Sequence, residues 1–229
     1  MTNYIEKLYE KGSQSKIKII LPESDERILK ARKELQSMGF SIISIDDYKD
    51  NIDIYIKFLK KKNFTNNWPE NKIVEYINCS SIVKGLILVA IGKADALVAG
   101  AVTPTSDVIR HAIRIIGLKS NVKWLSSIFF MISKNGKRAF TYGDCGVIPD
   151  PNSEQLCEIA KLSSEFHYKL TREEPKVAFL SFSTKGSAEH YRVQKVRDAV
   201  EMFSKKYNII HDGEIQFDAA ISPKVALRK

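Results

Sequence analysis

Short apolar runs alternate with helically spaced apolar positions along this chain. Lys16–Leu21, Ser41–Ile45 and Lys176–Phe182 are β-branched or continuous apolar runs of the kind that form buried strands. In residues 52–59 the apolar side chains recur every three to four positions, which predicts a helix. Ser24 is the predicted cap of the helix that follows the first strand. Repeated strand and helix patterns of this kind predict an α/β fold with a mainly parallel sheet covered on both faces.

A hairpin interrupts the alternation in the second half of the chain. Trp124–Ile132 and Arg138–Tyr142 both have strand composition, and Lys134-Asn135-Gly136 lies between them. Asn-Gly is a strong signal for a tight hairpin turn because both central residues must accept a positive φ. We therefore expect an antiparallel pair within an otherwise parallel fold.

The change of pattern also marks a domain boundary. The segment Gly117–Asn121 is the predicted junction. We expect a first α/β domain at residues 1–118 and a second α/β domain, with the hairpin, at residues 119–229. A chain of 229 residues is long enough for two modest domains, each with its own core.

The segment Ala94–Arg110 contains the clearest chemical signal. It reads as a buried strand, a Gly turn, a hydroxyl-rich loop and the start of a helix. Hydroxyl groups and free N–H groups at a helix N-terminus attract anions, because the helix dipole is positive there. Thr103, Thr105 and Ser106 supply hydroxyls, and Arg110 adds a cation suited to phosphate. These residues predict a site for a small phosphate-bearing ligand.

A second candidate loop follows the predicted strand that ends near Phe182. Ser183, Thr184 and Lys185 precede Gly186 at the carboxyl end of this strand, where ligands bind in open α/β sheets. The spacing is not that of a Walker P-loop. A strand-to-helix turn that needs a glycine and a cap explains the segment equally well, so both interpretations stay open.

The cysteines and histidines give little indication of chemistry. Asp144 lies in a Gly- and Pro-rich turn and is either a base or a hydrogen-bond anchor. Cys145 becomes a nucleophile only with a base or cation beside it, so an inert thiol is favoured. Cys79 and Cys157 are predicted to be packing residues. Three cysteines without a C-x-x-C pair, and four isolated histidines, predict neither a disulfide framework nor a metal site.

The net charge of +9 does not indicate a nucleic-acid partner, since the lysines are scattered and only Lys60–Lys62 forms a run. The apolar run around Leu86–Ile91 is too short to span a bilayer, and the N-terminus has no signal-peptide layout. We therefore expect a cytoplasmic protein with neither a nucleic-acid nor a membrane partner.

Five segments occur in a recognisable order along most of the chain: Ile19–Leu29, Ala94–Arg110, Gly143–Val147, Pro175–Ser187 and Asp212–Ala220. Together they resemble the phosphate acetyltransferase (phosphotransacetylase) family. This family is related to phosphate butyryltransferases and to the C-terminal region of some malic enzymes, so the resemblance implies the family and leaves the acyl group open.

The resemblance implies a three-layer α/β/α fold of the isocitrate/isopropylmalate dehydrogenase type, with two domains, a cleft between them, and a homodimer. The family converts acetyl-CoA and phosphate to acetyl phosphate and CoA, with CoA and acetyl-CoA as substrates and with neither a cofactor nor a metal. A base takes the proton of the CoA thiol, and cations and hydroxyls hold the phosphate. The matching positions are Thr103, Thr105, Ser106 and Arg110 for phosphate, and Ser183, Thr184 and Lys185 for the cleft wall or CoA.

Two departures from the family pattern affect the expected activity. The 229 residues contain no Asn-Asp-Leu-Ser-Arg-Gly segment, from which the family takes its catalytic serine and arginine, with its base close by. Asn78–Lys84 stands where the family has an Arg-Lys pair. We therefore expect a shortened chain with an impaired catalytic site. The alternative is a non-catalytic remnant or sensor that binds CoA, acetyl-CoA or phosphate.

Overall fold

The protein is described from a computed structural model, which describes residues 3–48 and 52–228. The ends of the predicted domains, Met1 and Lys229, lie outside these residues. The chain forms two compact units. The N-terminal unit is Tyr9–Lys123, and the C-terminal unit is Trp124–Lys229 together with Met1–Leu8. The division into domains at residues 118 and 119 stays a prediction, because compactness alone does not define a domain that folds independently.

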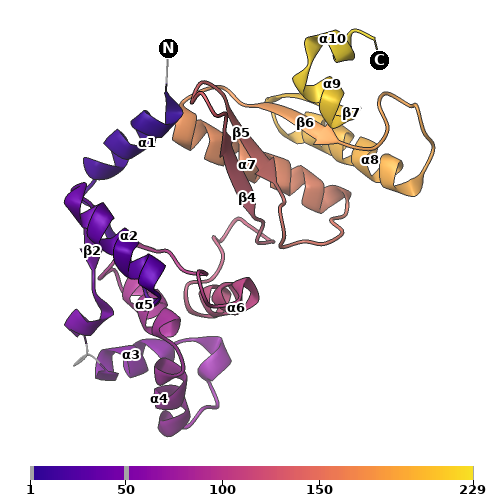
Figure 1. The fold of residues 1–229 in the computed structure, drawn as a ribbon. Coiled ribbons are helices and arrows are strands. Elements are labelled where there is room, and N and C mark those ends of the chain that lie inside the picture. Colours follow the sequence, from indigo (N-terminus) through magenta and orange to yellow (C-terminus); the bar gives the residue numbers. More distant parts are fainter. Residues whose placement is uncertain (1–2, 49–51, 229) are drawn as a thin grey trace. The chain divides into compact units, whose positions relative to one another are not determined.

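A three-stranded parallel sheet organises the N-terminal unit, with strand order β2-β1-β3 (Figure 1). The strands are β1 (Lys18–Ile20), β2 (Ser41–Ile43) and β3 (Ala96–Leu97). The central strand pairs Ile19 with a residue of each neighbour, and the next residue, Ile20, is fully buried. Parallel pairing requires a crossover between strands, which the helices of this unit supply.

The four helices between residues 52 and 115 of the N-terminal unit bury their apolar faces in one core. Ile73, Ile77, Val83, Leu88 and Ile115 are fully buried there. The helices are α1 (Tyr4–Ser13, which begins in the C-terminal unit), α2 (Glu26–Ser37), α3 (Ile52–Leu59), α4 (Glu70–Asn78), α5 (Ser81–Ala90) and α6 (Thr105–Ile115), with 3-10 turns η1 (Ile45–Tyr48) and η2 (Asn63–Thr65).

Two local predictions in this unit are wrong. The cap of α2 is Asp25 and not Ser24, because the Asp25 carboxylate accepts a hydrogen bond from the Arg27 N–H at 2.9 Å. Cys79 is exposed at the end of α4 and is not a packing residue. Its neighbours Ile77 and Ile82 take the buried positions instead.

The C-terminal unit contains the predicted hairpin. β4 (Ile128–Ile132) and β5 (Ala139–Gly143) are antiparallel, with Phe130 opposite Thr141. Gly136 has φ +70°, a value that favours glycine, and the Asn135 side chain accepts a hydrogen bond from the Lys137 N–H at 3.1 Å. The hairpin prediction is confirmed.

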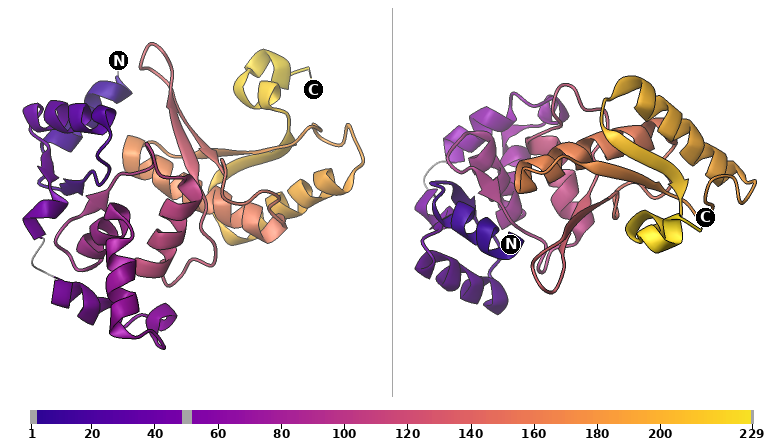
Figure 2. Two further views of the ribbon diagram at one scale, coloured as in Figure 1. Left: turned by 60° about the horizontal axis from the view of Figure 1, so that its bottom comes forward. Right: turned by 90° about the horizontal axis from the view of Figure 1, so that it is seen from above.

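A second, parallel pair of strands lies in the same unit. β6 (Lys176–Leu180) runs parallel to β7 (Ile210–Ile215), and the intervening helix α8 (Tyr191–Lys206) packs on both strands (Figure 2). Phe203 of α8 and Cys157 of α7 (Ser153–Thr171) are buried in the core of this unit. The remaining helices are α9 (Phe217–Ile221) and α10 (Pro223–Ala226).

The predicted α/β class with parallel strands is confirmed, although the strands form three separate sheets. Among the residues described, no single helix is long and apolar enough to cross a membrane. The pair α4 and α5 passes that test only when combined, and the two helices are bent by 105°.

The aromatic core of the C-terminal unit gives a stability prediction. The Phe203 ring is fully buried and lies 5.4 Å from the Phe179 ring centroid. Replacing Phe203 by alanine leaves a cavity, and we expect it to lower the free energy of unfolding by about 3–5 kcal/mol. The matched control is Phe129→Ala, because Phe129 is 60% exposed on β4. Urea unfolding of both variants checks this, and equal losses would contradict the assigned core.

Candidate functional site

The loop between β3 and α6 is wrapped around one carboxylate. Glu23, which follows β1, accepts hydrogen bonds from four successive backbone N–H groups: Gly100 at 3.0 Å, Ala101 at 2.9 Å, Val102 at 3.0 Å and Thr103 at 2.8 Å. Successive N–H groups that converge in this way form an anion-binding concavity. The loop therefore forms such a concavity, but its N–H groups already have an acceptor inside the chain.

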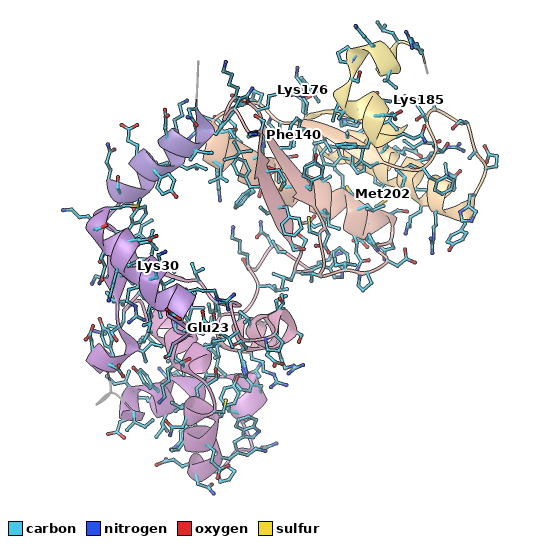
Figure 3. All side chains as sticks on the ribbon, viewed as in Figure 1. Glu23, Lys30, Phe140, Lys176, Lys185 and Met202 are labelled. Atoms are coloured by element: carbon cyan, nitrogen blue, oxygen red, sulfur yellow. The ribbon has the colours of Figure 1, made fainter. Side chains whose placement is uncertain are left out.

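Glu23 is only 6% exposed. Burial acts to raise its pKa, but the N–H groups of Thr103, Ala101 and Val102 outweigh burial and lower the pKa to about 2. Glu23 is thus a permanent internal anion at neutral pH, and its charge is balanced by backbone dipoles. Figure 3 labels it in the N-terminal unit.

The predicted phosphate residues lie on the outer side of this loop. Thr105 and Ser106 form the exposed first turn of α6, whereas Thr103 is half-buried. Arg110 is exposed and forms an ion pair with Asp107, with an Nη1–Oδ1 distance of 2.7 Å. The four predicted residues are therefore brought together on one loop and helix, and Arg110 has an intramolecular carboxylate as its partner.

A second buried carboxylate organises the loop after β6. Glu214 is 2% exposed and accepts hydrogen bonds from the Ser183 hydroxyl at 2.5 Å and from the Gly186 N–H at 3.1 Å. Arg197 of α8 forms an ion pair with it. Burial acts to raise the pKa of Glu214, but the Arg197 and Ser183 hydrogen bonds lower it overall. Ser183 is fully buried, so its hydroxyl serves this carboxylate.

Lys185 points its charge outward from the same loop. Its φ is +48° and that of Gly186 is +88°, so the chain turns through two left-handed residues. The Lys185 ammonium forms an ion pair with Asp212, and both side chains are exposed. Thr184 is buried, and its hydroxyl accepts a hydrogen bond from the Gln216 N–H at 3.0 Å. Of the three residues predicted in this loop, Lys185 is the one accessible to a solute.

A third carboxylate, Asp144, distinguishes between the two interpretations of the Gly-rich turn. It accepts hydrogen bonds from the N–H groups of Ser127 at 2.8 Å and Ile148 at 2.5 Å. Burial acts to raise the pKa of Asp144, but the Ser127 hydroxyl and these N–H groups lower it to about 2. A carboxylate with so low a pKa is a weak proton acceptor, and this one holds the turn, so the hydrogen-bond anchor is the favoured interpretation.

Cys145 has no activating partner in its contacts. Its Sγ donates to the Tyr142 carbonyl at 3.2 Å, and its N–H donates to the Ser127 hydroxyl at 3.0 Å. A carbonyl does not withdraw the thiol proton, so these contacts favour the inert interpretation of this cysteine. Within the described part of the chain, no cluster of three or more His, Cys, Asp or Glu side chains could hold a metal ion.

The sequence predicted an anchor as one of two roles for Asp144, but it did not identify the anchoring roles of Glu23 and Glu214. Glu23 lies within one of the family-like segments, directly after Pro22 at the carboxyl end of β1, and Glu214 lies within another. The one signal in the sequence that could have indicated these anchoring roles is a glutamate at the end of a predicted parallel strand. The partner loop of Glu23 is 77 to 80 residues away in sequence, so local patterns could not identify it.

The fold and these loops define an α/β protein with hydroxyl groups and cations at the carboxyl ends of parallel strands, where such proteins bind anionic ligands. A family model described as "Phosphate acetyl/butaryl transferase" matches residues 39–229. The chain belongs to this family, and the resemblance inferred from its sequence is confirmed.

Similar proteins span the whole chain. A phosphate acetyltransferase of Staphylococcus aureus (strain MRSA252) is 36% identical over 262 residues, covering 100% of this chain and 78% of that protein. The structure of the EutD phosphotransacetylase from Staphylococcus aureus has a TM-score of 0.78 and 34% identity, covering 99% of this chain and 76% of that one. A phosphotransacetylase from Streptococcus pyogenes has a TM-score of 0.84 and 29% identity, covering 99% and 77%.

The Glu23 contacts predict a pH-dependent contribution to stability. Glu23→Gln removes the charge and directs an NH₂ group at backbone donors, so we expect a loss of roughly 1–3 kcal/mol in unfolding free energy at neutral pH. Because the folded pKa is below the ordinary value, the contribution is present above that value and is lost as the pH falls through the folded pKa. The difference between wild type and variant should therefore shrink from about pH 6 to about pH 3.

The control is Glu34→Gln, which changes an exposed glutamate of α2. We expect this variant to change the unfolding free energy by less than about 0.5 kcal/mol at either pH. Urea titrations of the three proteins provide the measurement. A Glu23→Gln effect that equals the control, or that does not vary with pH, would rule out the assigned anchor.

Proposed function

We propose that this protein binds phosphate and CoA thioesters and acts in the phosphate acetyltransferase reaction, acetyl-CoA plus phosphate giving acetyl phosphate plus CoA. The observation that carries the proposal is the family match over residues 39–229, which includes both hydroxyl-bearing loops. The names of relatives that cover the entire chain support the same reaction. The proposal includes the homodimer that the resemblance implies and the cytoplasmic location expected from the sequence, and it leaves the choice between acetyl and longer acyl groups open.

Phosphate binds, in this proposal, at the first turn of α6. Thr103, Thr105 and Ser106 offer hydroxyls, and Arg110 offers two parallel N–H donors. Since Glu23 already takes the N–H groups of the loop, the side chains and not the loop backbone bind the ligand. Phosphate also has to compete with Asp107 for Arg110, and an exposed ion pair of this kind is worth about 1 kcal/mol or less.

The CoA side of the reaction is assigned to the loop after β6. Lys185 is the exposed cation there, and Ser183 and Thr184 hold the loop that presents it. We infer that Lys185 contacts an anionic group of CoA. Asp212 neutralises Lys185 in the absence of ligand, as Asp107 does for Arg110.

The reaction breaks the acyl–oxygen bond of acetyl phosphate and forms the acyl–sulfur bond of acetyl-CoA, or the reverse. A base takes the thiol proton, the thiolate attacks the carbonyl carbon, and phosphate leaves with the bonding electrons. In the part of this reaction that we assign here, Arg110 and the hydroxyls hold the phosphate as charge develops on it.

We infer that these 229 residues alone turn over slowly. They contain no Asn-Asp-Leu-Ser-Arg-Gly segment, the source of the catalytic serine and arginine in the family that the chain resembles. Loss of one such donor costs on the order of 3–4 kcal/mol, or about a thousandfold in rate. The same observation favours the second candidate function, a non-catalytic protein that binds CoA, acetyl-CoA or phosphate.

Calorimetric titration with inorganic phosphate tests the proposed site. Arg110→Ala should weaken phosphate binding by about tenfold or more, because a hydrogen-bonded charge is lost. Lys119→Ala removes the same charge from an exposed position outside the site and should leave phosphate affinity unchanged. Equal affinities of wild type and Arg110→Ala would refute this phosphate site.

An assay of phosphate-dependent CoA release from acetyl-CoA separates the two functions. Slow turnover that Arg110→Ala abolishes supports the transferase. Binding of CoA or phosphate without any turnover supports the non-catalytic alternative. Absence of both binding and turnover would refute the proposal as a whole.

A further inference from the structure

Helix α6 has a second arginine one turn beyond the proposed phosphate residues. Arg110 and Arg114 are both exposed. They are four residues apart, so they lie on one face of α6 (Figure 1), with Cβ atoms about 5–6 Å apart. Burial lowers the pKa of His111, and the charges of Arg114 and Arg110 lower it further, whereas Asp107 acts to raise it. The two arginines therefore place their charges around the same histidine.

Arg114 has no acidic partner within the described part of the chain. Its guanidinium lies over the Phe64 ring, with 6.0 Å between Cζ and the ring centroid. Arg110, Lys185 and Arg197 each form an ion pair with a carboxylate of the chain. An anion that binds Arg114 therefore has no internal carboxylate to displace.

Three aromatic rings support the Arg114 guanidinium, and we call them the aromatic shelf: Phe64, Trp68 and Tyr76. The Phe64 ring centroid lies 5.6 Å from that of Trp68 and 5.6 Å from that of Tyr76, in edge-on contacts. All three rings pack against the buried core of the N-terminal unit. A guanidinium held on fixed rings loses less conformational freedom when it binds an anion.

The aromatic shelf is also joined to α6 by a hydrogen bond. The Tyr76 hydroxyl oxygen of α4 lies 2.8 Å from Nδ1 of His111. Burial raises the pKa of Tyr76, and the Arg114 charge acts in the opposite direction, which places this charge beside the Tyr76 hydroxyl. The shelf, His111 and Arg114 thus form one connected group next to Arg110.

We propose that a ligand with two linked phosphate groups binds across Arg110 and Arg114. One group occupies the phosphate position at the first turn of α6, and the second lies one turn further along, at Arg114. Each arginine offers two parallel N–H donors, and both side chains are long enough to converge on adjacent phosphate groups. A single phosphate ion uses Arg110 and the hydroxyls, so Arg114 discriminates in favour of a diphosphate.

The inference rests on the proposed function, because Arg110 supplies one of the two contacts. It adds a consequence for that function. A diphosphate bound across the two arginines occupies the position of the substrate phosphate, so it competes with phosphate and slows the proposed reaction. The recognised chemistry is the diphosphate group, whether this is the free ion or part of a nucleoside diphosphate.

Calorimetric titration with inorganic phosphate and inorganic diphosphate, in the absence of divalent cations, tests the inference. Wild type should bind diphosphate at least about tenfold more tightly than phosphate, because a second set of charge-assisted hydrogen bonds forms. Arg114→Gln should lose this preference and keep the wild-type affinity for phosphate. Diphosphate added first should weaken phosphate binding to wild type.

The matched control is Arg138→Gln. Arg138 is an exposed arginine of the C-terminal unit whose Cζ lies 4.9 Å from the Phe140 ring centroid, so it resembles Arg114 in charge and in its aromatic support. We expect Arg138→Gln to keep the wild-type preference for diphosphate. Circular dichroism confirms that both variants are folded.

Titration with ADP separates the two sources of the diphosphate group. Binding of ADP as tight as that of inorganic diphosphate supports a diphosphate ester as the ligand. Weaker binding of ADP, with tight binding of inorganic diphosphate, supports the free ion, because an ester bond then blocks one end of the site.

The NMR signals of the His111 ring report occupation of the site without a variant of either arginine. A diphosphate bound across Arg110 and Arg114 offsets the charges that lower the pKa of His111, so it should raise this pKa more than phosphate does. His111→Asn identifies the signals. The other groups that face this ring are the Tyr76 hydroxyl and Asp107.

Three results would overturn the inference. Equal affinities of wild type for phosphate and diphosphate would leave the phosphate site in place and remove the second contact. Equal losses of diphosphate affinity in Arg114→Gln and Arg138→Gln would show a general effect of net charge. Failure of wild type to bind either ion would refute the proposed phosphate site itself, and the diphosphate site with it.

Discussion

Ionised carboxylates held by loop N–H groups are the constraint on which the functional loops of this protein depend. Glu23 accepts four successive N–H groups, Asp144 holds the turn after β5, and Glu214 joins the loop after β6 to α8. Removing a carboxylate from water is expensive unless hydrogen bonds replace the water. Any movement of these loops would leave the charge unpaired, so the loops are fixed before a ligand arrives. The hydroxyls of Thr105 and Ser106, which directly follow the loop held by Glu23, are therefore also held in place.

The cations fall into two energetic classes. Arg110 and Lys185 have exposed partners, and such ion pairs are weak enough for an anionic ligand to displace the partner. Arg197 is paired with the buried Glu214, and separating that pair would leave an uncompensated charge in the interior. This difference identifies Arg110 and Lys185 as the cations available to a ligand, and Arg197 as a structural residue.

Local signals account for the parts of the fold that the sequence predicted. The Asn-Gly turn predicted the hairpin, and Asn152 caps α7 through a capping box with Gln155. Helix α4 begins at Glu70, at the end of a stretch that reads as a polar loop, and was not predicted. The anchoring roles of Glu23 and Glu214 were also not predicted, because Glu23 meets its loop only in the folded chain. The division of the strands into three separate sheets could not be predicted either, because it depends on which strands pair in the folded chain.

Glu23 is an ionised internal ligand of its loop, and the order of the phosphate loop depends on it. Titration of the Glu23 side-chain carboxyl by ¹³C NMR in the folded protein measures this most directly. We predict a pKa of about 2, because the loop N–H groups stabilise the charged form despite burial. A pKa at or above the ordinary glutamate value would show that these N–H groups do not hold the carboxylate, and would contradict the account.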